Sequence, residues 1–363
     1  MKIHIFNPEH DMAMAANTPL FTAPHAARQL RHDLDFLPAL WCDEGDIVLV
    51  ADKERAQKAF ARIRASLGRI GVHITGNALF ADDIDASQLL IDGADVWGWD
   101  NAIVQKLTDI GVPGTLLPTA DDIDNVRALS HRRTSARLLQ GFPGFEVREC
   151  SDYDAVLDAV SSFGGTAVLK MPWSSSGRGL RYIENGSFNP HQEGWTKNVI
   201  RKQGSVMVEP YYNKVMDFAM EFCARHDGTI GYEGLSLFYT ENGQYRGNLL
   251  ATENLKQNIL KHYVSKDCLS ATKQRLTELA STLLHGYIGK FGIDMMLIRR
   301  NDDQVEIHPC VEINLRRTIG HIALSASPTD DDYVKAMRIE FDGTRYKLKI
   351  VSAGRQNIQD DRC

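Results

Sequence analysis

Two apolar runs on either side of a short polar turn constrain the fold of this chain more than any other feature. Residues 291–298 and 311–315 form the two runs, and the polar residues around Asp303 separate them as in a β-hairpin. Asp294 in the first run and Glu312 in the second each lie nine residues from Asp303. A turn centred on Asp303 would place the two carboxylates directly opposite each other, close enough to bind one metal ion or two adjacent ones.

The second run continues as a row of polar side chains at a spacing of two residues. Glu312, Asn314 and Arg316 lie on one face of an extended strand, about 6–7 Å apart in steps. A carboxylate, an amide oxygen and a guanidinium in line suit a magnesium–triphosphate complex beside a second anion. The alternative is a strand end with solvated charges.

Three segments, taken together, resemble the ATP-grasp superfamily. Residues 294–297, followed by 312–316, are similar to its metal-binding end. Residues 166–180 and 205–212 match two further motifs in the order and spacing that the superfamily requires. Each motif alone is weak, but three in the correct order are specific. The resemblance implies an ATP-grasp fold from about residue 120 to residue 325.

Lys170 ends an apolar strand and precedes a loop rich in serine and glycine. Glycines allow the backbone to approach phosphate oxygens, and the lysine adds a positive charge for the same anion. The resemblance implies that Lys170 contacts the α- and β-phosphates of ATP and that the loop closes over them. The implied loop residues are Ser176, Gly177, Arg178 and Gly179. A solvent-exposed serine–glycine turn is the alternative.

The next strand ends at Glu209, which in the family precedes a hinge that binds adenine. The adenine amino group needs only a carbonyl, and Pro210 retains its carbonyl. The resemblance further assigns a backbone N–H of Tyr212 to the adenine ring nitrogen and Asp217 to the ribose hydroxyls.

The chain departs from the family at a lysine that usually touches phosphate before the first lobe. Arg132 and Arg133 occupy that region, and either is able to replace the lysine, although arginine binds as a planar fork. Lys256 lies where relatives often place a lysine for the γ-phosphate. A solvated surface lysine is an equal alternative for Lys256.

The resemblance implies an ADP-forming ligase of the carboxylate–amine type. ATP would phosphorylate a substrate carboxylate, and an amine or other nucleophile would displace phosphate. Asp294, Glu312 and Asn314 would hold Mg²⁺ or Mn²⁺, while Arg316 and Lys256 act at the reacting groups. The substrates are small molecules or peptides that the sequence does not identify. A small-molecule kinase and a non-catalytic nucleotide-binding module remain as alternatives.

The sequence also predicts how the chain is divided. Residues 1–117 alternate strands and helices, which indicates a parallel α/β domain before the ATP-grasp unit. Residues 118–204 would form the small lobe, 205–351 the large lobe and 352–363 a disordered tail. The predicted α/β plus α+β elements include strands at 2–6, 47–50, 95–97, 166–170 and 206–209, and helices at 53–67, 129–139 and 269–287.

The segment after the first strand, residues 7–19, contains His10 and Asp11 at a position that often faces ligand in α/β sheets. Asp11 is equally suited to cap the helix that follows.

Charge and composition limit the possible partners. The net charge is −6 and no sustained stripe of Lys and Arg occurs, which argues against nucleic acid. The six cysteines show no metal-ligand spacing, and no apolar run approaches the roughly 20 residues of a membrane span. We expect a cytoplasmic protein without a membrane partner, and a homodimer is one open arrangement.

Overall fold

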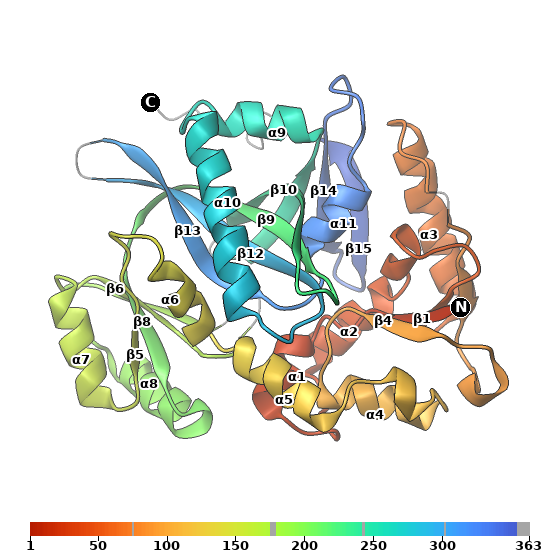
Figure 1. Ribbon diagram of the computed structural model, residues 1–363, viewed down its shortest axis with the longest axis horizontal. Helices are drawn as coiled ribbons and strands as arrows, with labels where there is room; N and C mark the ends of the chain where they lie inside the picture. The colour runs from red at the N-terminus through yellow and green to blue at the C-terminus, as the bar shows by residue number, and fades with distance from the viewer. Residues whose placement is uncertain (75, 175–178, 242–243, 301–302, 354–363) are drawn as a thin grey trace.

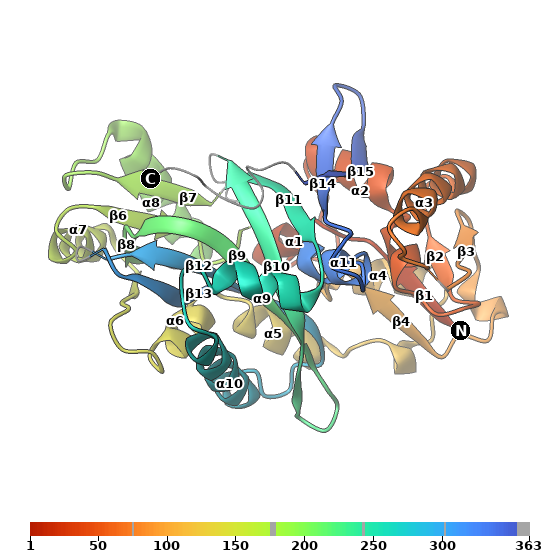
Figure 2. The same cartoon turned by 90° about the horizontal axis from the view of Figure 1, so that it is seen from above.

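The computed structural model describes residues 1–74, 76–174, 179–241, 244–300 and 303–353. Three sheets organise it, and the largest lies between the N-terminal domain and a small lobe (Figures 1 and 2). No helix within these ranges is long and apolar enough to cross a membrane.

The N-terminal domain is a parallel sheet with the strand order β3-β2-β1-β4, as the alternation of strands and helices predicts. Its helix α3 (Lys53–Gly68) begins where the Asp52 side chain accepts a hydrogen bond from the N–H of Arg55, and it buries Phe60 and Leu67. The other elements are β1 (Lys2–Ile5), α1 (His10–Ala16), α2 (His25–Leu34), β2 (Ile47–Leu49), β3 (Leu79–Ala81), β4 (Gly93–Val96), α4 (Asn101–Asp109) and the short 3-10 turns Leu37–Leu40, Ala86–Gln88 and Gly114–Leu116.

The small lobe is an antiparallel sheet with the order β5-β8-β6-β7, covered by two helices. Its strands are β5 (Arg148–Cys150), β6 (Ala167–Lys170), β7 (Leu180–Ile183) and β8 (Val206–Pro210), and its helices are α7 (Tyr153–Ser162) and α8 (Pro190–Gln203). The predicted division after residue 204 is wrong for β8, which lies between β5 and β6 in this sheet.

Two short helices precede the small lobe, α5 (Ala120–Leu129) and α6 (Arg133–Leu139). The single helix predicted at 129–139 is therefore wrong in its first residues. The cause is a break at Ser130–Arg132, where α5 ends and the chain turns before α6 begins.

The large lobe is an antiparallel sheet with the order β13-β12-β9-β10-β11-β14-β15. Its strands are β9 (Asn213–Ala224), β10 (Ile230–Glu241), β11 (Gln244–Leu250), β12 (Gly289–Arg299), β13 (Val305–Asn314), β14 (Lys335–Phe341) and β15 (Tyr346–Ser352). Its helices are α9 (Glu253–Leu260), α10 (Lys266–Leu283) and α11 (Ile319–Ser325). β15 includes Ser352 of the predicted tail, and residues 354–363 lie outside the described residues.

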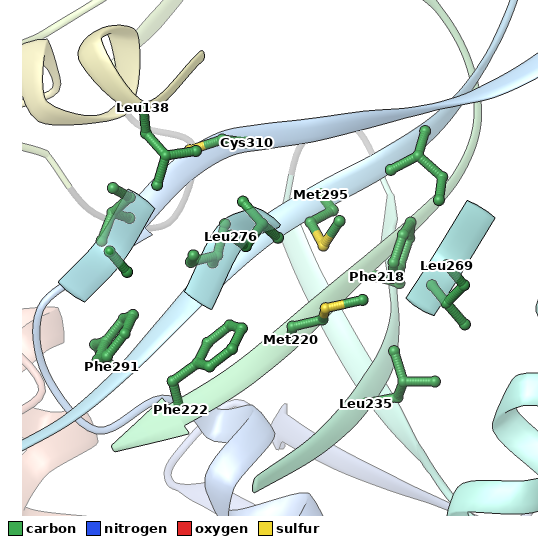
Figure 3. Packing of buried hydrophobic residues seen from close by; sticks show 14 of the residues in the cluster. Leu138, Phe218, Met220, Phe222, Leu235, Leu269, Leu276, Phe291, Met295 and Cys310 are labelled. Carbon is green, nitrogen blue, oxygen red and sulfur yellow. The ribbon is translucent and has the colours of Figure 1, made fainter. Parts of the chain in front are cut away.

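One face of the large sheet forms the main core. On β9, Phe218, Met220 and Phe222 point into this core with residues of α10 such as Leu276 (Figure 3). Alternate residues of a strand point to opposite faces, so the residues between them face the other way. That other face carries the polar side chains described below.

Asp294 and Glu312 are direct cross-strand partners in β12 and β13, as the sequence predicts. The predicted turn centre is wrong, because Arg299 pairs with Val305 and the midpoint lies one residue before Asp303. Continued without interruption, that register would not align the two carboxylates.

A β-bulge restores the predicted pairing. Met296 pairs with His308 and Asp294 with Glu312, so β13 has two more residues than β12 between these pairs. Pro309 lies in the longer segment, and proline has no N–H to donate to a ladder.

Candidate active site

A cleft of about 810 Å³ separates the sheet of the small lobe from the polar face of the large sheet. Strands β6, β7 and β8 form one wall, and β9, β10, β11, β12 and β13 form the other. The cleft brings together most of the predicted site residues: Lys170, Glu209, Pro210, Tyr212, Asp217, Asp294, Glu312, Asn314 and Arg316.

Lys170 and Glu209 form a buried ion pair on the small-lobe wall. The Lys170 Nζ lies 2.6 Å from the Glu209 Oε2, and the two side chains are only 6% and 9% exposed. The same Nζ donates a hydrogen bond to the Val311 carbonyl at 3.4 Å. Lys170 therefore joins the small lobe to strand β13 across the cleft.

The base of the predicted glycine-rich loop is described, but its tip is not. The Gly179 carbonyl accepts a hydrogen bond from the N–H of Met171 at 2.9 Å. A Cβ at Gly179 would overlap the Ser174 side chain, so this close approach requires glycine. Ser176, Gly177 and Arg178 lie outside the described residues, and Gly179 itself does not line the cleft.

Arg132, and not Arg133, faces inward. Its guanidinium Nη2 lies 2.8 Å from the Glu312 Oε1, and its Nε donates to the Met171 carbonyl at 2.9 Å. Arg133 pairs instead with Glu149 at the surface. Of the two arginines that the sequence leaves open, only Arg132 connects the base of the loop to the metal-binding strand.

Asp294 and Asn314 lie side by side on the large sheet. The Asn314 amide donates to the Asp294 Oδ2 at 3.0 Å. Burial raises the pKa of the Asp294 carboxyl to about 7, and the charge of Glu312 acts in the same direction. The hydrogen bond from Asn314 opposes this rise. A positive charge near Asp294 would therefore stabilise the charged form of this carboxyl.

The donor set of Asp294, Glu312 and Asn314 matches the hard oxygen ligands that Mg²⁺ prefers. In this structure the Asn314 Oδ1 accepts a hydrogen bond from Arg316 at 2.9 Å. No group of three or more His, Cys, Asp and Glu side chains within the described ranges is arranged to hold a metal ion. The residues fit Mg²⁺ in type, with two carboxylates as charged ligands and an amide oxygen as the third.

Arg316 is held in place by the N-terminal domain. Its Nε and Nη2 donate to the Asp11 carboxylate at 2.8–3.1 Å, and the two side chains are 14% and 17% exposed. Although burial opposes the charged form, the Arg316 guanidinium lowers the pKa of Asp11. His10 is turned away and lies 3.1 Å from the Asp100 carboxylate.

The predicted loop after the first strand therefore reaches Arg316 through Asp11. The side chain of Asp11 makes no N-cap hydrogen bond, because the N-cap residue of α1 is Glu9. None of the described residues 7–17 lines the cleft itself. Asp11 is placed to position Arg316, and the prediction that this loop faces the substrate is wrong for its side chains.

Lys256 is neither in the cleft nor on the surface, which contradicts both sequence interpretations. Its side chain is buried on α9, where its Nζ donates to the Leu235 carbonyl at 3.0 Å and to the Ser327 Oγ at 3.4 Å. Burial lowers the pKa of Lys256 to about 8, against the opposing charges of Glu253 and Glu221. Lys256 fastens α9 to strand β10.

The residues assigned to the nucleoside lie at the other end of the cleft. The Asp217 carboxylate accepts hydrogen bonds from Lys214 at 2.6 Å and from Thr240 at 2.7 Å. The Tyr212 ring packs edge-on against His308 and at a tilt against Phe145, and its hydroxyl hydrogen-bonds with the backbone of Glu146. The Tyr212 backbone remains the group assigned to the base.

Sequence reasoning missed Glu221, a cleft-lining carboxyl that is 1% exposed. Burial raises its pKa to about 8, the Thr318 hydroxyl lowers it by hydrogen bonding, and the charge of Asp294 raises it further. The signal was present in β9, where Asp217 and Glu221 alternate with the apolar residues of the core. That alternation places both carboxylates on the face opposite Phe218 and its neighbours.

Comparison with solved structures finds a similar fold at low sequence identity. N5-carboxyaminoimidazole synthetase from Staphylococcus aureus, solved as a complex with ADP, has a TM-score of 0.50 and 12% identity, with 94% of this chain and 83% of that chain covered. A biotin carboxylase from Campylobacter jejuni has a TM-score of 0.49 and 12% identity, with 93% and 75% covered. No protein-family model matches the chain, and no curated protein matches its sequence. The chain has the ATP-grasp fold, preceded by a parallel α/β domain.

Proposed function

We propose that this chain, an ATP-grasp fold, is an ATP-dependent, ADP-forming ligase that joins a carboxylate to an amine. One observation carries the proposal. The Lys170 ammonium on the small lobe and the paired Asp294 and Glu312 carboxylates on the large lobe line the same cleft. A triphosphate needs a cation on one side and metal-binding oxygens on the other.

The nucleotide would lie along the hinge between the lobes. The synthetase from S. aureus was solved with ADP, which supports nucleotide binding by this fold. Lys170 and the loop residues Ser176, Gly177, Arg178 and Gly179 would contact the phosphates. The backbone of Pro210 and Tyr212, beyond Glu209, would bind the base, and Asp217 would bind the ribose. Arg132, already at the base of the loop, would supply the charge of the missing lysine.

Asp294, Glu312 and Asn314 would hold Mg²⁺ or Mn²⁺. When bound, such an ion neutralises phosphate charge and makes the terminal phosphoryl group more electrophilic. Asp294 is suited to this role because burial disfavours its charged form unless a cation is near.

The protein's own task is positioning. A substrate carboxylate oxygen would attack the γ-phosphorus and release ADP, and an amine would then attack the acyl phosphate carbon and release phosphate. Arg316, fixed by Asp11, would orient the carboxylate by charge and direction. The walls of the cleft would shield the acyl phosphate from water, which would protect it from hydrolysis.

The test is a titration of ATP with and without Mg²⁺, followed by a screen for ADP release with pools of amino acids, small carboxylates and peptides. We expect ATP binding and ADP release that depends on a carboxylate and an amine, with one new amide in the products. A phosphorylated hydroxyl group in the products would indicate a kinase. ATP binding without turnover in any pool would indicate a binding module.

A further inference from the structure

Glu221 is a buried carboxyl in the cleft to which the proposed reaction assigns no role. It lies on β9 beside the metal-binding strands, with Gly292 of β12 as its cross-strand partner and Gly234 of β10 on the other side. A Cβ at either Gly292 or Gly320 would overlap its carboxyl oxygens. The carboxyl therefore fills a niche that only glycine at these two positions leaves open.

One oxygen of this carboxyl lacks a donor. The Glu221 Oε2 is buried, and no group in the described part of the chain donates a hydrogen bond to it. The His321 Nδ1 lies 3.1 Å away, but that nitrogen accepts the N–H of Thr318 and so presents its lone pair. In the charged form of Glu221 this oxygen is a buried acceptor without a donor, which is costly, and a ligand that brings both a donor and a positive charge would relieve that cost.

Ser236 offers a further acceptor beside the other oxygen of the Glu221 carboxyl, Oε1. A Cβ at Gly320 would also lie 2.7 Å from the Ser236 Oγ, so Ser236 and Glu221 share one space. Ser236 and Asn248 are 2% and 1% exposed, line the cleft, and hydrogen-bond to each other at 2.6 Å. A primary ammonium carries three donors and needs several acceptors of this kind.

We propose that Glu221 and Ser236 bind the amino group of the acceptor, so that the acceptor is a primary amine. This inference rests on the proposed ligase function and specifies its second substrate. A negatively charged or purely apolar acceptor would leave the Glu221 oxygen without a donor. The nearby Arg316 charge does not oppose an ammonium ion strongly, since Asp11 neutralises it.

The position also suits the chemistry. Gly292, the cross-strand partner of Glu221, lies two residues from Asp294 on the same strand. An amine in the cleft that contacts the Glu221 carboxyl would therefore lie next to the site where the acyl phosphate forms. Its nitrogen would form the new C–N bond as the C–O bond to phosphate breaks and the electron pair leaves with phosphate. The ammonium gives one proton to solvent before this attack, which frees the lone pair of the nitrogen, and the new amide nitrogen gives a second proton to the phosphate.

The test uses the full chain with saturating ATP and Mg²⁺, and free amino acids compared with their N-acetylated forms. Wild type, Glu221→Gln and Glu233→Gln are assayed for ADP release. Glu233 is the matched control, because it also lies near His321 but does not line the cleft. We expect stimulation by at least one free amine over its N-acetyl form. Glu221→Gln should raise the KM for that amine about tenfold or more, as for loss of a charge-assisted contact.

The KM for ATP should stay within about twofold in Glu221→Gln, and Glu233→Gln should resemble wild type in both constants. A purely structural role for Glu221 would lower the melting temperature and leave the amine KM unchanged, which would overturn the inference. So would equal stimulation by N-acetylated compounds or by KCl, or intact ATP turnover that no amine stimulates. Failure to bind ATP at all would instead refute the proposed function.

Discussion

Replacing Lys170 by methionine tests whether one ion pair serves both stability and nucleotide binding. Methionine preserves most of the side-chain length and removes the charge, so Glu209 stays buried without its partner at 2.6 Å. Removing one member of a buried pair costs about 3–5 kcal/mol. Lys170→Met should therefore lower the free energy of unfolding by about that amount.

The double variant Lys170→Met with Glu209→Gln separates the two effects. Replacing both charges by uncharged groups of similar volume is often neutral or stabilising, so the double variant should recover most of the lost stability. It should not recover ATP affinity. The lost charge-assisted contact to phosphate is worth about 1.5–3 kcal/mol, which corresponds to roughly a tenfold to hundredfold weaker Kd in both variants.

Urea denaturation measures the free energy of unfolding, and isothermal titration with Mg²⁺ measures the ATP affinity. Lys290→Met is the control, because Lys290 pairs with Glu233 outside the cleft and both side chains are about one-third exposed. That variant should lose less than about 1 kcal/mol and keep its ATP affinity. An ATP affinity in Lys170→Met equal to that of wild type would remove Lys170 from the site. Equal stability of the single and double variants would refute the argument from a buried pair.

Three further predictions address other parts of the site. Asp294→Asn should lower Mg²⁺-dependent turnover by at least about 100-fold, since even groups that only orient metal ligands cost up to about 100-fold in activity when they are replaced. The melting temperature of this variant should stay the same or rise, and retained turnover would exclude Asp294 as a ligand. Asp11→Asn should lower turnover and should lower the free energy of unfolding by about 3 kcal/mol, while ATP affinity stays unchanged. A normal turnover rate would contradict the role of Asp11 in positioning Arg316. Burial lowers the pKa of His308 to about 3, so in wild type the stability that neutral His308 provides is present above about pH 6.5 and is lost as the pH falls. Relative to wild type, His308→Phe should therefore gain about 1.4 kcal/mol per pH unit between pH 6.5 and 4 in urea denaturation, and a pH-independent difference would refute the assignment.

Local patterns in the sequence were sufficient to predict residues on the polar face of the large sheet. The two-residue spacing of Glu312, Asn314 and Arg316 and the position of Asp294 depend only on strand geometry, and all four residues line the cleft. The pairing of Asp294 with Glu312 was correct although the turn centre was wrong. A bulge that includes Pro309 compensated for the error, and spacing counted from a turn cannot reveal a bulge.

Local sequence patterns could not predict the contacts between distant segments of the chain. Arg132 and Arg133 are neighbours with the same side chain, and only the packing of α6 against β13 decides which of them meets Glu312. Lys256 gave no local sign of burial, because its partners Leu235 and Ser327 belong to other parts of the chain. Glu221 was visible as a strand residue, but its niche depends on glycines from two other elements.

Three cations in or beside the cleft share one property, which explains why the roles predicted for single residues were incomplete. Lys170, Arg132 and Arg316 each pair with a carboxylate from another element: Glu209, Glu312 and Asp11, respectively. Phosphate alone would have to compete with these carboxylates and would add negative charge to a buried site, which is costly. A ligand that carries both phosphate and a divalent cation avoids this cost for the Arg132–Glu312 pair, since the arginine gains phosphate as the carboxylate gains the cation. Arg132 and Glu312 then each keep a partner of opposite charge, so the cleft is better matched to a metal–nucleotide complex than to a free nucleotide.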